Sequence, residues 1–280
     1  GKSTLVDGLI RLYRDQGKRV AVLAIDPTSP YSGGAILGDR IRMQQHFTDA
    51  GVFIRSIATR GHLGGLSRST GDVLHVLHAA EFDVVILETV GVGQDELEVT
   101  QLADTTLVVM APGLGDDIQA IKAGILEVAD VFAVNKSDRA GADATAQDLQ
   151  QMLSLRRVPV GVGQMQGHTA VSTLRRGPEA EAGEWVPPII KTIAHRKEGI
   201  PALVEAFEKH REFLTTTDAG RAIQANRRLA ELRAILVQAL IDEVDTRFAD
   251  RVSAKLDEIL EGRADPYTCA EALVREAIRG

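Results

Sequence analysis

The sequence has 280 residues and a single cysteine, Cys269. One thiol cannot build a disulfide framework within the chain or a cysteine-based metal site. A lone free cysteine is most often a small residue of the core. The absence of disulfide chemistry favours a reducing compartment, so we expect a cytoplasmic protein, with an organelle matrix as the alternative.

Long apolar runs and basic tracts are also missing. No apolar stretch approaches the roughly 20 residues that span a bilayer, and lysine and arginine are not clustered. The net charge is −7 and the pI is about 5.6. We therefore expect neither a membrane nor a nucleic acid as a partner. Hydrophobic residues make up 44% and charged residues 25%, as in ordinary globular proteins.

Short apolar strands alternate with helical segments over the first 215 residues. Strands are predicted at 19–25, 52–58, 82–88, 105–111, 131–135 and 189–194, and helices at 3–16, 70–81, 116–128, 144–155 and 200–214. This alternation predicts an α/β fold with a mostly parallel sheet and helices on both faces. Ligands of such folds bind at the carboxyl ends of the strands.

Two regions depart from this alternation. Residues 158–187 are rich in Gly, Pro and small polar residues, which predicts an irregular loop, with Trp185 as its anchor. From 218 onward the sequence is helical, and leucines at 229, 232, 236 and 240 share one helix face. We therefore predict an α/β domain over 1–215 and a helical extension over 216–280.

The chain opens with Gly1-Lys2-Ser3-Thr4 followed by a helix. These residues match the second half of the phosphate-binding loop G-x-x-x-x-G-K-[ST], so the strand and first half of the loop are expected to lie outside this sequence. In such loops the lysine binds the β- and γ-phosphates, the hydroxyl of Ser3 binds Mg²⁺, and the first amides of the helix hold the anion. The alternative is an ordinary helix start capped by Ser3 or Thr4.

A second motif, Asn135-Lys136-Ser137-Asp138, follows a predicted strand. The carboxylate of Asp138 can accept from N1 and the 2-amino group of guanine together, while Asn135 and Lys136 shape the pocket. Adenine lacks this pair of donors and would leave the carboxylate unpaired. The motif therefore predicts a guanine site, and the alternative is a polar turn.

Acidic residues follow other predicted strands. Asp26, Asp39 and Glu88 offer the hard oxygen ligands that Mg²⁺ prefers. Gly91 stands where a backbone N–H can bind the γ-phosphate, and Gln94 where a side chain can orient the attacking water. The predicted catalytic residues are Lys2, Glu88 and Gln94. The alternatives are a turn residue for Asp26 and a helix cap for Asp39.

Five ordered motifs carry a resemblance to a known family. They are Asp26-Pro-Thr-Ser-Pro, Gly34-Ala-Ile-Leu-Gly-Asp-Arg-Ile-Arg-Met43, Arg60-Gly-His-Leu-Gly-Gly65, Glu88-Thr-Val-Gly-Val-Gly-Gln94 and Pro112-Gly-Leu-Gly-Asp-Asp-Ile-Gln-Ala-Ile-Lys-Ala-Gly124. Together they resemble the MeaB/ArgK family of GTPases, closely over residues 1–138 and loosely beyond.

The resemblance implies a homodimeric GTPase that chaperones an adenosylcobalamin-dependent acyl-CoA mutase, above all methylmalonyl-CoA mutase, and that does not bind the cobalamin itself. By the same resemblance, Mg²⁺ lies among Ser3, Asp26, Asp39 and Glu88. A third switch would report the nucleotide state to the mutase, through Asp116, Gln119 and Lys122.

The sequence departs from the family at two places. Asp95 stands where the family has serine, which adds a negative charge beside the predicted switch glutamine. The last guanine motif, Ser-Ala in the family, is Thr192-Ile193-Ala194, and the backbone N–H of Ala194 can still serve the guanine O6.

Two other functions are open alternatives. A metallochaperone GTPase would need a Cys/His delivery site, and the pair His75 and His78 has no evident third ligand. A protein kinase or ATPase-like accessory of amino-acid transport would need a catalytic base for phosphotransfer, and no such motif is recognisable.

Overall fold

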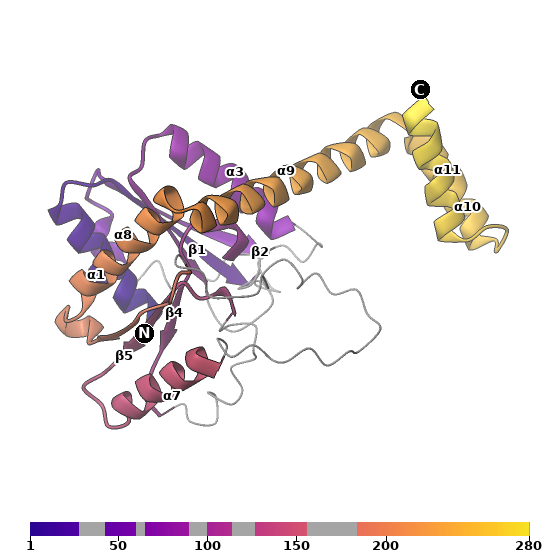
Figure 1. Ribbon diagram of the computed structural model, residues 1–280. Coiled ribbons are helices and arrows are strands. Elements are labelled where there is room, and N and C mark those ends of the chain that lie inside the picture. Colours follow the sequence, from indigo (N-terminus) through magenta and orange to yellow (C-terminus); the bar gives the residue numbers. More distant parts are fainter. Residues whose placement is uncertain (28–42, 60–64, 90–99, 114–126, 156–183, 280) are drawn as a thin grey trace. The chain divides into compact units, whose positions relative to one another are not determined.

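The computed structural model describes residues 1–27, 43–59, 65–89, 100–113, 127–155 and 184–279 (Figure 1). Within these ranges the chain forms two compact units, Gly1–Gln224 and Ala225–Gly280. The first unit contains every strand of the described ranges, and the second is helical.

The strands of the first unit form two parallel sheets. One has the order β2-β1-β3, from β1 (Val20–Pro27), β2 (Val52–Thr59) and β3 (Val84–Thr89). The other has the order β4-β5-β6, from β4 (Leu107–Met110), β5 (Val131–Asn135) and β6 (Ile189–Thr192). Parallel pairing places the carboxyl ends of neighbouring strands at one edge, where ligands are expected.

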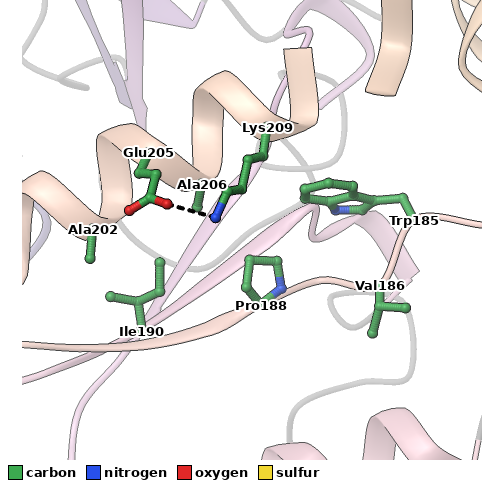
Figure 2. A pocket seen from close by; sticks show the side chains of 8 residues that line it. All are labelled: Trp185, Val186, Pro188, Ile190, Ala202, Glu205, Ala206 and Lys209. Atoms are coloured by element: carbon green, nitrogen blue, oxygen red, sulfur yellow. Dashed lines mark ion pairs between the residues drawn. The ribbon is translucent and has the colours of Figure 1, made fainter. Parts of the chain in front are cut away.

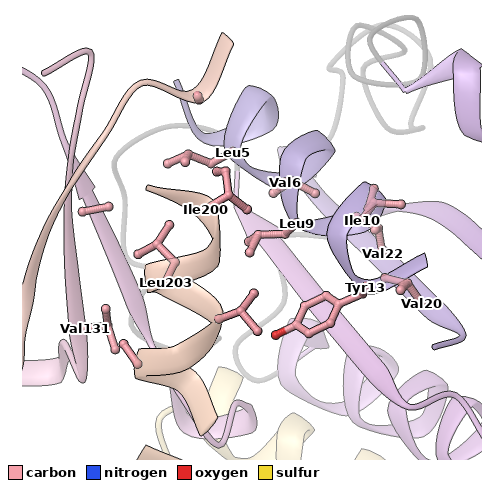
Figure 3. Close-up of a cluster of buried hydrophobic side chains, with 14 of the residues drawn as sticks. Leu5, Val6, Leu9, Ile10, Tyr13, Val20, Val22, Val131, Ile200 and Leu203 are labelled. Atoms are coloured by element: carbon pink, nitrogen blue, oxygen red, sulfur yellow. The ribbon is translucent and has the colours of Figure 1, made fainter. Parts of the chain in front are cut away.

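Helices cover both faces of these sheets. α1 (Lys2–Asp15) and α8 (Ile200–Thr216) share one buried cluster with Val20 and Val22 of β1 and with Val131 and Ala133 of β5 (Figure 3). The intervening residues face the other side. There α3 (Gly65–Ala79) packs on β1, and α7 (Ala142–Leu155) packs on β5. Because helices cover both faces of the sheets, side chains on both faces of the strands are buried, and this explains why the strands are apolar almost throughout.

A small residue brings α1 and α8 close together. A Cβ added to Gly8 would lie 3.2 Å from the side chain of Ile200, tighter than ordinary contact. Leu5, Leu9 and Leu203 fill the surrounding space and are at most 4% exposed. Burying a side chain of this size stabilises the fold by about 1.5–3 kcal/mol. The start of α1 is therefore held firmly against the rest of the unit.

The predicted α/β fold with helices on both faces is confirmed. All six predicted strands are present, with ends shifted by at most two residues. The helix predicted at 70–81 begins earlier, at Gly65. Most of the helix predicted at 116–128 and of the loop predicted at 158–187 lies outside the described residues.

The second unit continues a long helix and adds two shorter ones. These are α9 (Asp218–Arg247), α10 (Ala249–Leu260) and α11 (Pro266–Arg279). Arg251 of α10 and Glu276 of α11 form an ion pair at 2.5 Å, and Cys269 is 4% exposed, which confirms its predicted place as a buried residue. Among the described residues, no helix is long and apolar enough to cross a membrane.

Candidate functional site

Predicted magnesium ligands lie at the ends of two neighbouring strands. In the parallel register of β1 and β3, Ala24 lies opposite Glu88 and Ile25 opposite Thr89, so Asp26 follows directly at the same edge. Glu88 is 4% exposed. An ionised carboxylate at such a depth is costly unless cations or hydrogen-bond donors compensate for it.

The first turn of α1 lies at a strand-end edge as well. Gly1 is the N-cap and has no side-chain cap, and the helix begins at Lys2. Ser3 and Thr4 therefore lie inside the first turn, so the alternative that one of them caps the helix is wrong. Their hydroxyls remain for other partners, and the amides of a helix N-terminus attract anions.

Asn135 joins this helix to the guanine motif. Its Nδ2 donates to the Gly1 carbonyl at 3.4 Å. Its Oδ1 accepts from the Lys136 N–H at 2.8 Å, the Thr192 hydroxyl at 3.2 Å and the Ala194 N–H at 3.1 Å. Asn135 is 2% exposed. One buried amide therefore fixes three segments that are far apart in the sequence.

Asp138 lies beyond this junction, in the turn that follows β5. Lys136 has a left-handed backbone with φ 59°, and the Ser137 N–H donates to the Thr192 carbonyl at 3.1 Å. These contacts fasten the turn to the end of β6, while the side chain of Asp138 is exposed. A base can therefore reach its carboxylate from solvent.

The segment after β6 closes into a short loop. Ile193 and Glu198 exchange backbone hydrogen bonds at 3.1 and 3.3 Å, around the 3-10 helix η3 (Ala194–Arg196). Ala194 begins η3, and its N–H is held by Asn135. This N–H would have to be shared with a guanine O6 to play the role that the sequence predicts.

The described residues suit a hard divalent cation. Ser3 supplies a hydroxyl, Glu88 supplies a buried carboxylate, and α1 contacts β3. Mg²⁺ is usually bound by one or two carboxylates together with phosphate oxygens and water, so this donor set fits it. Within the described ranges, no three histidine, cysteine or acidic side chains are placed together so that they could hold a metal ion by themselves, and His75 and His78 are both exposed on α3.

Several predicted site residues lie outside the described residues. They are Asp39, Gly91, Gln94, Asp95, Asp116, Gln119 and Lys122. Asp26 is described as part of β1 through its backbone. Among the described site residues, hydrogen bonds join Gly1, Asn135, Lys136 and Ala194 directly. Lys2, Ser3 and Thr4 follow Gly1 in the first turn of α1, Asp138 lies in the turn after β5, and Glu88 lies near the end of β3.

The sequence pattern does not reveal the role of Thr192. Its hydroxyl donates to Asn135, and it is 1% exposed. The sequence places Thr192 at the start of the last guanine motif but gives no partner for its hydroxyl. The link to Asn135 depends on the pairing of β5 with β6, in which these two residues lie opposite each other.

A second polar cluster lies at the opposite ends of the same strands. Trp185 Nε1 donates to the Asp130 carbonyl at 2.7 Å, and its ring lies 4.7 Å from that of His210. His210 Nδ1 lies 2.9 Å from the Thr105 hydroxyl. These contacts confirm the predicted role of Trp185 as an anchor.

Beside this anchor is a shallow hollow between α8 and the chain that enters β6 (Figure 2). Pro188 and Ile190 line one side, and Ala202 and Ala206 line the other. An ion pair between Lys209 and Glu205 at 2.6 Å closes its rim. Because the hollow adjoins the amino-terminal ends of β5 and β6, it is separate from the candidate nucleotide site.

Comparison with known proteins agrees with this geometry. The family described as "Methylmalonyl Co-A mutase-associated GTPase MeaB" matches residues 1–249. A protein of Pyrococcus abyssi named as a GTPase is 43% identical over 284 aligned positions, covering 100% of this chain and 81% of the relative. The GTPase ArgK of Escherichia coli is 35% identical, over 83% of this chain and 65% of its own length.

A mammalian protein and a solved structure are also similar. The mouse mitochondrial methylmalonic aciduria type A homolog is 32% identical, over 98% of this chain and 62% of its own length. The crystal structure titled "LAO/AO transport system kinase" aligns with a TM-score of 0.60 at 24% identity, over 100% of this chain and 78% of that one. At that identity the structural likeness supports the shared fold alone. From the family match and the sequence relatives it follows that this chain is a P-loop GTPase of the methylmalonyl-CoA mutase-associated family MeaB.

Proposed function

We propose that this GTPase is a nucleotide-dependent chaperone of an adenosylcobalamin-dependent acyl-CoA mutase of the methylmalonyl-CoA type. The family's association with such a mutase and the name of the mouse relative support the proposal. The junction at Asn135, which joins the helix of the phosphate-loop motif to the guanine motif, is the structural observation that supports its nucleotide-dependent part.

The roles of the site residues follow from their positions. Asp138 would orient the guanine base, and Lys2 with the first amides of α1 would hold the phosphates. Ser3, Asp26, Asp39 and Glu88 would hold Mg²⁺, which when bound neutralises charge on the phosphate oxygens. Gln94 would orient the attacking water, and Gly91 would donate its N–H to the γ-phosphate. Asn135 keeps the two halves of the site in register.

Coupling to the mutase requires a segment that differs between nucleotide states. A partner is affected only if it binds the two states with different affinity. We assign this task to Asp116, Gln119 and Lys122, which follow β4 in the sequence. The segment begins just after Gly113, whose left-handed φ of 90° turns the chain beyond the end of β4.

We also propose that the helical extension forms a homodimer. Leu229, Leu232, Leu236 and Leu240 of α9 are 44–62% exposed. Apolar side chains repeated on one helix face are typical of a surface that another copy can cover. The double substitution Leu232→Glu and Leu236→Glu should convert a dimer to a monomer in sedimentation, whereas Asp245→Lys, a charge reversal at an exposed position on the opposite face of the same helix, should not. An unchanged mass of the double variant would contradict the dimer assignment.

GTP hydrolysis with and without purified methylmalonyl-CoA mutase tests the chaperone function. We expect the mutase to raise the rate several-fold, and an isobutyryl-CoA mutase in parallel tests the choice of partner. Lys122→Ala should keep the basal rate and lose the stimulation, while Lys209→Ala, on the exposed side of α8, should keep both. A rate that neither mutase changes, with no complex on co-purification, would contradict the proposal.

A further inference from the structure

A group of unpaired cations lies at the rim of the candidate guanine site. Lys136 and Arg139 belong to the turn after β5, and Arg196 and Lys197 belong to η3 and the C-cap that follows it. All four side chains are exposed or half-buried. Within the described residues, none of these four side chains forms a hydrogen bond or an ion pair. The whole chain carries a net charge of −7, so a local group of unpaired positive charges is unexpected.

Cations elsewhere in the first unit have partners. Ion pairs join Arg14 to Asp49, Lys18 to Glu208, Lys191 to Asp143, Lys209 to Glu205 and Arg221 to Asp218. Among the described lysine and arginine side chains of this unit, one more is exposed without such a partner, namely Arg55 on β2. The unpaired cations therefore gather at one edge and are not spread evenly over the surface.

Backbone hydrogen bonds hold the two segments that carry these cations beside each other. The Ser137 N–H donates to the Thr192 carbonyl at 3.1 Å, which fastens the turn 136–139 to the end of β6. The loop 193–198 is closed by the two backbone hydrogen bonds between Ile193 and Glu198. Because the backbone is already fixed, a partner that binds the four cations does not have to order it, and less conformational entropy is lost on binding.

The charge of this edge selects the kind of partner. Two carboxylates lie in the same segments, but Asp138 is assigned to the guanine base, which leaves Glu198 beside four cations. Such an edge attracts an acidic surface over about one Debye length, roughly 8–10 Å at physiological salt. A nucleic acid would also meet the net negative charge of the rest of the chain. An acidic face of a protein therefore fits this edge better.

We propose that the turn 136–139 and the loop 193–198 form a docking surface for an acidic face of the partner mutase. The inference rests on the proposed function, which supplies the mutase as the partner. The same two segments carry Asp138 and the Ala194 N–H, so a mutase docked here lies against the guanine side of the nucleotide site. The surface is distinct in sequence from the segment around Lys122 that is proposed above to report the nucleotide state.

Arg139→Glu combined with Arg196→Glu tests the inference, through the Kd of the complex with purified methylmalonyl-CoA mutase. Charge reversal on a docking surface acts mainly on the association rate, so we expect Kd to rise about 10-fold at low salt. At about 0.5 M salt the difference from the wild type should shrink to about twofold, because exposed charges are screened. Both side chains are exposed, so basal GTP hydrolysis and the affinity for GDP without mutase should stay within about twofold. Lys136 is left unchanged, because it belongs to the guanine motif.

Two control variants separate a local effect from a general one. Arg55→Glu makes the same change of charge at an exposed, unpaired arginine of the other sheet, and should leave Kd within about twofold. Arg139→Lys combined with Arg196→Lys keeps the positive charge. It should keep the affinity of the wild type, because long-range attraction depends on charge and not on the fork of the guanidinium.

Two results would overturn the inference alone, in a protein whose wild type binds the mutase. One is an unchanged Kd in the double glutamate variant, and the other is an equal rise of Kd in Arg55→Glu, which would indicate a general effect of net charge. Binding of poly(U) RNA that the double glutamate variant loses, with an unchanged Kd for the mutase, would assign the surface to nucleic acid instead. Failure of the wild type to bind either mutase at any salt concentration would remove the proposed function, and the docking surface with it.

Discussion

The side-chain amide of Asn135 donates to the carbonyl of Gly1 across 134 residues of sequence, at 3.4 Å. Gly1 has no side chain at the point of contact, and a Cβ there would lie 2.6 Å from Asn135 Nδ2. The close approach therefore depends on glycine at one end and asparagine at the other. It ties the helix that would hold phosphate to the turn that would hold the base.

Asn135→Ala should lower the free energy of unfolding of the protein and also disturb its nucleotide site. It would leave the Thr192 hydroxyl and the Lys136 and Ala194 amides without their acceptor. Each buried polar group that loses its partner costs about 1–3 kcal/mol, so we expect a loss of at least 2 kcal/mol, measured by urea unfolding. Thr192→Val removes one of these donors and should cost about 1 kcal/mol. Equal stability of Asn135→Ala and the wild type would show that the junction contributes nothing.

Gly199→Ala should disrupt the start of α8. Gly199 has φ 80°, and a Cβ there would lie 2.4 Å from the Lys191 carbonyl oxygen and 2.9 Å from Thr192 Cγ2. Backbone atoms cannot move aside cheaply, so we expect a loss of more than 2 kcal/mol. Gly17→Ala is the control, because Gly17 has a similar φ of 77° and open space around it. It should cost only the left-handed strain of about 1–2 kcal/mol, and a similar loss in both variants would contradict the steric explanation.

Trp185→Phe should separate the hydrogen bond of the anchor from its packing. Phenylalanine can still lie against His210 and Phe213, but it cannot donate to the Asp130 carbonyl. We expect a loss of about 1 kcal/mol, followed by circular dichroism because this is the single tryptophan. GTP hydrolysis should be unchanged, since the anchor lies away from the nucleotide site. A large loss of activity with normal stability would place Trp185 in the functional machinery.

Tyr13 should make the protein less stable at alkaline pH. Burial, with a smaller contribution from Glu208, raises the pKa of Tyr13 from about 10 to about 12. The unfolded chain therefore releases the phenolic proton at lower pH than the folded chain, which favours unfolding. Stability from this source is complete below pH 10 and is lost as the pH rises towards 12. Tyr13→Phe should flatten this part of the stability curve, and an identical slope in both proteins would refute the shift.

Much of the fold could be predicted from the sequence, because its strands are continuous apolar runs and its helices have a regular period. The start of α3 could not be predicted, because residues 65–69 lack the apolar spacing that marks a helix. The boundary between the two compact units falls within α9, after Gln224, where the helical pattern is unbroken. The pattern of apolar residues locates helices and strands, whereas the exact ends of these elements and the boundary between the compact units depend on packing.

The candidate site, too, could be predicted from the sequence only in part. Short motifs predict nucleotide-binding roles for Lys2, Ser3, Asn135 and Asp138, because the chemistry of phosphate and guanine binding requires those residue types in that order. The contacts that hold them are not visible in the sequence, since each joins segments with no shared pattern. Asn135 with Gly1, and Ser137 with Thr192, are such pairs. They become neighbours only when the sheet and α1 are assembled.

The base preference of an Asp138→Asn variant tests the central claim most directly, namely that guanine is bound at the turn after β5. The amide oxygen of asparagine can still accept from N1–H, but its NH₂ group would face the 2-amino group of guanine, so two donors would meet; xanthine carries an oxygen at that position, which accepts from the amide. Sites built on such hydrogen bonds discriminate strongly, so we predict that the variant loses GTP hydrolysis by roughly 100-fold or more and gains hydrolysis of xanthosine triphosphate. A variant that still prefers GTP to the same degree as the wild type would contradict the account.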